Sequence, residues 1–158
     1  MEHFLFDQQS FIREQTLKLA DSVSEELADQ IPDGFRNSIR WNLGHIYVVW
    51  ERHAFQYIGE PLEVPDGYRE LFEYNTTPLT QPADIPVPSL EEIKGYLRAQ
   101  PVRMKAILSD RLQEKIEPPY TTSAGMTLAS PEQFLSFGLY HEGMHQSVIK
   151  LYQKLLTL

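Results

Sequence analysis

The chain has 158 residues, of which 42% are hydrophobic and 23% are charged, and it carries a formal net charge of −8 with no cysteine. This length predicts a single domain spanning residues 1–158, ample for one hydrophobic core. The acidic balance, without a Lys/Arg cluster, argues against nucleic-acid binding, and the lack of cysteine excludes disulfides and thiolate metal ligands.

Membrane and export signals are not found in the sequence. No apolar run approaches the ~18 residues that a transmembrane helix needs. The first residues lack the basic region and apolar stretch of a signal peptide. We therefore expect no membrane association and a cytoplasmic location.

Four stretches have the apolar period of an amphipathic helix. The first covers residues 4–29 and ends at the turn of residues 31–34, which contains both proline and glycine. The second covers residues 38–58, with Gly59 as its expected C-terminal cap. The apolar face of this second helix consists of Ile39, Leu43, Ile46, Val49, Trp50 and Tyr57.

Residues 59–88 separate the second helix from the third. Their six prolines exclude one continuous helix, and we predict a long crossover with a short helical turn over residues 66–74. The third helix begins after Ser89, which has capping-box spacing to Glu92. Pro101 interrupts its apolar pattern, so we expect a kink or two helices in tandem there.

Residues 113–129 are predicted to form a loop with a short extended piece over residues 120–122. The fourth helix has the clearest start, because Ser130 is a good N-cap and Pro131 fits the first helical position. Its predicted inward positions are Phe134, Phe137, His141, Met144 or His145, Val148, Tyr152 and Leu155. Together these segments predict an all-α fold, a four-helix bundle with a long crossover connection between helices 2 and 3.

The fourth helix contains His141, Glu142 and His145, which match the H-E-x-x-H pattern of zinc proteases. Residues four apart lie above one another on one helix face, so the two imidazoles can bind one divalent metal. Residues 146–158 contain no His, Asp or Glu that could complete a protease site, which disfavours that interpretation. Glu142 lies about 100° round the helix from His141. We expect it to be a solvated surface residue, with a catalytic general base as the weaker alternative.

A third ligand must come from elsewhere, and His45 on the second helix is the candidate. It shares the inward stripe with Asn42 and Val49, and Gly44 beside it lets another backbone or a ligand approach closely. His53 is displaced from His45 by about 80° around the helix. This favours a position on the surface or behind the metal ligands, although His53 could line the same cavity. The alternative for these histidines is a core imidazole with hydrogen-bonded nitrogens.

The pattern Trp-x-x-Gly-His-Ile at residues 41–46, followed by His-x-x-x-His at residues 141–145, resembles the DinB family. This is a family of DNA-damage-inducible four-helix bundles that includes the bacillithiol S-transferases. The resemblance covers nearly the whole chain. It implies that His45, His141 and His145 bind a divalent metal, usually zinc or nickel, with coordination positions left open.

The resemblance also implies a function and an assembly. Several relatives resemble metal-dependent thiol transferases or isomerases, and family members are often homodimers. We therefore expect a transferase that joins a low-molecular-weight thiol, bacillithiol or a similar one, to a small electrophilic substrate. The family often continues after the last histidine with a Gly-Gln-Ile-like stretch, whereas residues 146–149 here are Gln-Ser-Val-Ile, so substrate identity does not carry over.

Two alternatives to a thiol transferase stay open. One is a metal-dependent hydrolase with Glu142 or a loop residue as general base. The other is a non-catalytic metal-binding stress protein whose coordination positions are filled by its own side chains. Four aromatic residues could shape either a pocket mouth or a dimer face in any of these proteins: Tyr47, Trp50, Tyr57 and Tyr140.

Overall fold

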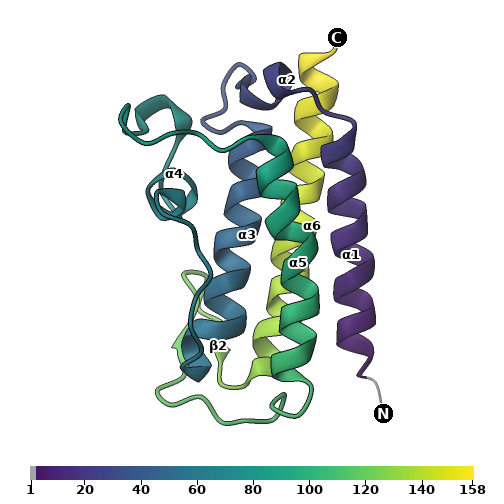
Figure 1. Ribbon diagram of the computed structural model, residues 1–158, viewed down its shortest axis with the longest axis vertical. Coiled ribbons are helices and arrows are strands. Elements are labelled where there is room, and N and C mark those ends of the chain that lie inside the picture. The colour runs from purple at the N-terminus through teal and green to yellow at the C-terminus, as the bar shows by residue number, and fades with distance from the viewer. Residues whose placement is uncertain (1–2) are drawn as a thin grey trace.

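The computed structural model describes residues 3–158, and four long helices in this range lie side by side as an all-α bundle (Figure 1). These helices are α1 (Phe4–Asp21), α3 (Ile39–Phe55), α5 (Leu90–Leu108) and α6 (Pro131–Leu156). The shorter elements are α2 (Glu25–Asp29), η1 (Gln56–Ile58), α4 (Tyr68–Phe72), η2 (Pro78–Thr80), β1 (Tyr120–Thr121) and β2 (Thr127–Leu128). The predicted fold class is therefore confirmed.

The predicted first helix over residues 4–29 is in fact two helices. α1 ends at Asp21, and α2 starts after Ser24, whose side chain accepts a hydrogen bond from the backbone N–H of Leu27. Ser22 turns its hydroxyl back onto the carbonyl of Leu19 at 2.8 Å. Two serines that bond to the nearby backbone offer it an alternative to the helical ladder, which explains the break.

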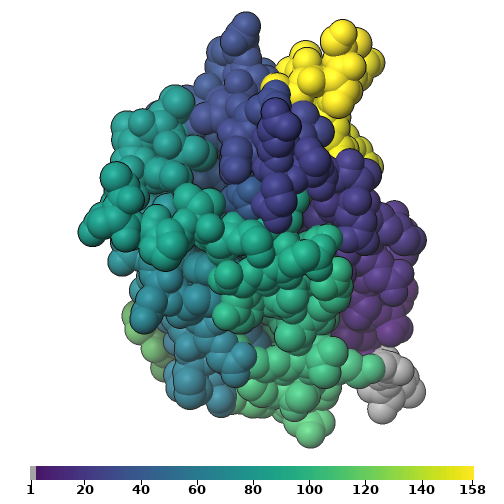
Figure 2. Space-filling view, turned by 45° about the horizontal axis from the view of Figure 1, so that its top comes forward, coloured from purple at the N-terminus to yellow at the C-terminus, as the bar shows by residue number. Residues whose placement is uncertain are grey.

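The crossover of residues 59–88 runs along the bundle and covers one side of it (Figures 1 and 2), and its helix α4 packs against α3. α3 ends at Phe55 and continues into η1, which Gly59 terminates in the left-handed conformation at φ 75°, as expected of a C-terminal glycine. Tyr68, Leu71 and Phe72 of α4 are buried. The α4 part of the crossover is therefore packed against the bundle, and residues next to it close one side of the site described below.

α5 is one continuous helix, so of the two expectations at Pro101 that of two helices in tandem is wrong. A proline has no N–H, which leaves the carbonyl four residues earlier, that of Leu97, without its helical donor. Arg13 of α1 supplies the missing bond, because its Nη1 donates to the Leu97 carbonyl oxygen at 2.6 Å. A side chain from a neighbouring helix thus repairs the hydrogen-bond ladder at the proline.

The loop before α6 contains a small antiparallel hairpin. Tyr120 pairs with Leu128 and Thr121 pairs with Thr127, so the extended piece predicted at residues 120–122 is present and has a partner strand. Gly125 takes φ 90° in the turn, a value that glycine adopts without strain. The hairpin stands beside the end of α3 and forms a second wall of the site.

The core face of α6 agrees with the predicted one only in part, since Phe134 and Tyr152 are buried as expected and other predicted positions are not. Its buried residues are Pro131, Phe134, Leu135, Gly138, Leu139, Glu142, Ile149 and Tyr152. Met144 and Leu155, which were predicted to point inward, are each 41% exposed. Within the described residues, no helix is both long and apolar enough to cross a membrane.

Candidate metal centre

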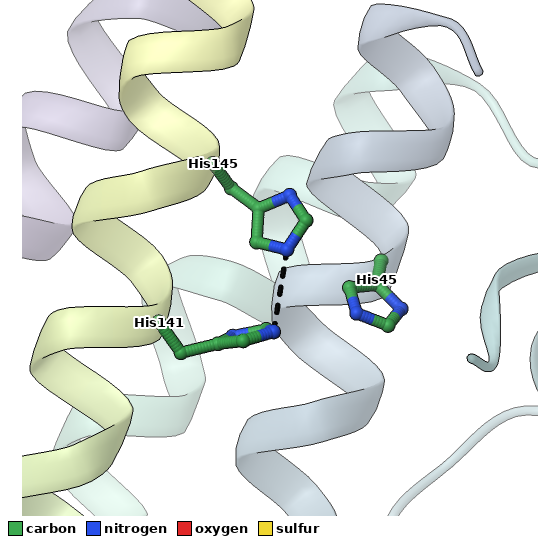
Figure 3. A group of neighbouring side chains, drawn as sticks. All are labelled: His45, His141 and His145. Atoms are coloured by element: carbon green, nitrogen blue, oxygen red, sulfur yellow. Dashed lines mark hydrogen bonds between the residues drawn. The ribbon is translucent and has the colours of Figure 1, made fainter. Parts of the chain in front are cut away.

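Three histidines from two helices converge beside the core. His45 projects from α3, and His141 and His145 project from successive turns of α6, so that the three rings face one another (Figure 3). One ring nitrogen from each residue lies within 4.8 Å of the other two. The structure therefore brings together all three residues that were predicted to form a triad.

His45 is oriented by the end of α4. Its Nδ1 lies 2.7 Å from the backbone carbonyl oxygen of Phe72. Because a carbonyl can only accept, this nitrogen must carry the ring proton, and Nε2 keeps its lone pair. The close approach depends on Gly44, since a Cβ at that position would lie 2.4 Å from Cγ of Phe72. The ring of Trp41 stacks on one face of the imidazole, at 4.5 Å between centroids.

His145 is oriented in the same way by a side chain. Its Nδ1 lies 2.7 Å from Oδ1 of Asn42, while Nδ2 of the same amide donates to the carbonyl oxygen of Ser38 at 2.8 Å. The Ser38 carbonyl fixes which end of the amide is oxygen. Nδ1 of His145 is therefore the donor, and its Nε2 carries no proton and keeps its lone pair. Metal-binding histidines commonly have such an oxygen partner on the second ring nitrogen.

His141 completes the group with less support. Its Nε2 lies 3.2 Å from Nε2 of His145, and its Nδ1 is buried without a hydrogen-bond partner among the described residues. In the metal-free protein, His141 donates its Nε2 proton to the bare nitrogen of His145. Its ring also lies 5.2 Å from that of His45 and 6.5 Å from that of His53, measured between centroids.

Burial keeps all three rings neutral. It lowers the pKa of His45, lowers that of His145 to about 3, and lowers that of His141 to about 2, with repulsion from neighbouring histidines as a further cause in the last two cases. A neutral imidazole is the form that binds a metal. Three such nitrogen donors, two of them set by oxygen partners, fit a divalent ion such as zinc or nickel.

The triad opens on a cleft of about 890 Å³ that runs along the groove between α3 and α6. The crossover side contributes Arg69, Glu73 and Tyr74, and the hairpin side contributes residues 120–124 apart from Thr121. Arg52 of α3 donates to Glu73 at 2.5 Å. Burial by itself would raise the pKa of Glu73. The hydrogen bond and the charge of Arg52 outweigh this effect, so the pKa of Glu73 is lowered. Sequence reasoning missed this pair, because partners 21 residues apart leave no periodic signal.

His53 lies in the cleft wall rather than on the surface. It is 5% exposed, and burial lowers its pKa to about 3. The expectation of a surface position is therefore wrong, whereas His53 does lie next to His141 and does share the cavity.

Glu142 is neither solvated nor part of the cleft, which corrects the expected surface position. It is 0% exposed, and its two carboxylate oxygens accept hydrogen bonds from three side chains. Arg13 donates twice, at 2.9 and 3.1 Å, and Thr16 and Trp50 donate once each, at 2.6 Å. With every lone-pair direction used, this carboxylate is structural and does not suit a general base.

The aromatic residues that were expected at a pocket mouth or dimer face divide into two groups. Tyr57 and Tyr140 do line the cleft. Tyr47 and Trp50 are instead buried in the core, at 2% and 1% exposure. Gly138 of α6 makes room for the indole of Trp50, because a Cβ there would lie 2.5 Å from it.

Comparison with known proteins agrees with this architecture. A conserved protein from Enterococcus faecalis has a similar crystal structure, with a TM-score of 0.71 and 14% sequence identity over 98% of this chain and 95% of the other. A comparison with curated protein sequences gave no match. The sequence profile of the DinB superfamily matches residues 8–149. The chain therefore belongs to the DinB superfamily.

Proposed function

We propose that this protein is a metal-dependent enzyme that transfers a low-molecular-weight thiol to small electrophilic molecules. The observation that carries the proposal is the position of the triad at the wall of an open cleft of about 890 Å³. That volume is within the range of small-molecule sites. A site that only stored or sensed a metal would need no such cleft.

The ligands in this proposal are His45, His141 and His145, and the metal is zinc or nickel. When bound, a divalent ion supplies a Lewis acid that lowers the pKa of a thiol or a water molecule in contact with it. The reaction forms a bond between the thiol sulfur and an electrophilic carbon of the substrate. The leaving group departs with the bonding electrons, and the thiol proton balances its charge.

The chain's own side chains hold the ligands in place and restrict water. The stacked indole of Trp41 covers one face of His45. The pair of Arg52 and Glu73 ties the end of α4 to α3 beside Phe72, whose carbonyl holds the same histidine. Ligand orientation thus rests on packed elements, as a preorganised site requires.

The thiol transferase is favoured over a hydrolase by the surroundings of Glu142. The hydrolase alternative named this residue or a loop residue as general base, but the carboxylate of Glu142 is fully buried and accepts four hydrogen bonds. No other carboxylate besides Glu73 lines the cleft among the described residues, and Glu73 is occupied by Arg52. The cleft therefore lacks a free carboxylate base for water.

Metal analysis of protein purified without an affinity tag is the first test. We expect about one zinc or nickel ion per chain, and we expect alanine replacement of His45, His141 or His145 to remove it. The loaded protein is then incubated with bacillithiol or another cellular thiol and a panel of electrophiles. Full metal occupancy without thioether formation in any combination would refute the transferase and leave a metal-binding protein.

We also propose a homodimer in the cytoplasm, where low-molecular-weight thiols are kept reduced. Support for the dimer comes from an apolar stripe on α6 that stays exposed in the described chain and whose first two members, Tyr140 and Met144, also border the cleft. Its members recur at steps of four and seven residues and are exposed by 41–61%: Tyr140, Met144, Leu151 and Leu155. Such spacing is typical of a helix that packs against another helix.

A further inference from the structure

The cleft extends past the metal centre toward the end of α3. Beyond the triad it is lined by His53 and Tyr57 from α3 and η1, Tyr120 from β1, and Phe137 from α6. Three of these four side chains are aromatic rings without charge. This end is therefore aromatic, whereas the crossover end is lined by the charged residues Arg52, Arg69 and Glu73. The two ends contact different parts of any bound molecule.

The aromatic wall is rigid because a buried ring supports it. Phe134 is 0% exposed. Tyr57 stacks on it at 4.7 Å between centroids and an interplanar angle of 21°, and Tyr120 stacks on it at 5.9 Å and 29°. Flat faces held in this way suit a flat ligand, since aromatic groups gain most from offset or edge contacts with rings.

His53 provides a polar group within this apolar wall. Its ring lies 5.5 Å from Phe134, 5.7 Å from Phe137 and 6.2 Å from Tyr120, measured between centroids. Its Nδ1 is buried and has no hydrogen-bond partner in the described part of the chain. Because the edge of the ring that carries Nδ1 is buried, the opposite edge, which carries Nε2, faces the cleft.

The proton of the neutral ring is best placed on Nε2. Buried N–H groups without a partner are rarer than buried acceptors without one, which favours leaving Nδ1 as the bare nitrogen. Nε2 is then a single N–H donor at the surface of an apolar pocket. Its position next to His141, at 6.5 Å between ring centroids, puts this donor beside the metal centre.

We propose that this end of the cleft is the electrophile subsite, and that it binds a flat, ring-containing molecule whose carbonyl or nitro oxygen accepts a hydrogen bond from His53. The inference rests on the proposed function for the meaning of electrophile, but binding at the subsite does not depend on turnover. His53 is thus a substrate-binding residue that selects molecules with an acceptor oxygen next to an aryl or similar flat group.

Two matched probes test the subsite directly: 4-fluoroacetophenone, which has the carbonyl acceptor, and 1-ethyl-4-fluorobenzene, which has nearly the same shape without it. Their dissociation constants are measured by ¹⁹F and protein-observed NMR titration, with zinc-loaded and with metal-free protein. We expect the ketone to bind about fivefold more tightly, the size of one neutral hydrogen bond. Shift changes should centre on Tyr57, Tyr120 and Phe137.

Two variants assign the effect. His53→Phe, whose ring suits the aromatic surroundings, should reduce the fivefold preference to about one while the hydrocarbon still binds. Phe137→Leu should weaken both probes alike and keep the preference, and thermal melting confirms that each variant is folded. Equal binding of the two probes to the wild type, or a preference that survives His53→Phe, would overturn the proposal.

A preference for the ketone that is seen only with zinc-loaded protein would also overturn the proposal, because the carbonyl oxygen would then be binding to the metal and not to His53. Failure of thiol transfer with the subsite intact would refute the proposed function alone.

Discussion

Gly44 controls the orientation of His45 through a residue that is remote in sequence. A Cβ built at Gly44 would lie 2.4 Å from Cγ of Phe72 and 2.6 Å from both of its Cδ atoms. Phe72 is 3% exposed, so its ring has no free space to enter. Its carbonyl oxygen is the hydrogen-bond acceptor for Nδ1 of His45, and Gly44→Ala should therefore disturb the metal centre without touching a ligand.

The size of the effect follows from the contacts. Ordinary van der Waals contact begins at 3.4 Å, so the ring must retreat by about 3.4 − 2.4 = 1.0 Å. A carbonyl that moved away with it would lengthen the 2.7 Å hydrogen bond to His45 beyond a useful length. We expect a loss of about 1–3 kcal/mol in unfolding free energy from overpacking. We also expect metal affinity to fall by about 10–100-fold, the usual effect of removing an oxygen partner from a ligating histidine.

The assay pairs urea unfolding with zinc affinity measured by competition against a chromophoric chelator. Gly95→Ala is the matched control, because Gly95 is also inside a long helix and a Cβ there meets nothing within 4 Å. The control should gain about 0.5–1 kcal/mol from helix propensity and bind zinc like the wild type. If Gly44→Ala behaved like this control in both assays, the argument that Phe72 positions His45 would be wrong.

Three further predictions concern charge and assembly. Glu142→Gln should lower the unfolding free energy by about 3–5 kcal/mol, because it breaks a buried ion pair, whereas the exposed control Glu14→Gln on α1 should stay within about 0.5 kcal/mol; urea titration distinguishes them. Glu73→Gln should cost about 1 kcal/mol at pH 7. The folded-state pKa of Glu73 is lowered, so its contribution is present above the unfolded value of 4.5 and is lost as pH falls through the lower folded value. The gap between wild type and variant in urea titrations should therefore close in acid, and a gap that persisted there would contradict the ion-pair argument. Charged replacements at Leu151 and Leu155 together should convert a dimer to a monomer in sedimentation velocity, while a monomeric wild type would refute the proposed dimer.

The convergence of the histidines was predictable because it follows from helix geometry. A spacing of four residues places His141 and His145 on one face regardless of what the helix packs against. His45 could be named from its own helix and from the family resemblance. The partners of the rings were not predictable in the same way, since the carbonyl of Phe72 comes from a crossover with no sequence period.

The predicted inward stripe of α6 was right only in part, because Phe134 and Tyr152 are buried whereas Phe137 and Leu155 lie beside the true core face. Two properties of the sequence caused the error. Apolar side chains also line the cleft, as Phe137 does, so the cleft face resembles a core face. The true core face contains Gly138 and Glu142, which look unsuited to a core until their partners are known. Trp50 explains both residues, because its indole fills the space over the glycine and donates to the carboxylate.

The H-E-x-x-H match in α6 therefore combines two independent requirements. Its histidines face the cleft, whereas Glu142 faces the core and accepts hydrogen bonds from α1 and α3. The bond from Trp50 joins the helix that carries His45 to the helix that carries the other two ligands. A buried charge that must be matched by Arg13 tolerates little sliding between these helices, because displacement would leave an uncompensated ion in the core. Glu142 thus fixes the separation of the two helices that carry the proposed metal ligands, a role that a catalytic base at the same position could not perform.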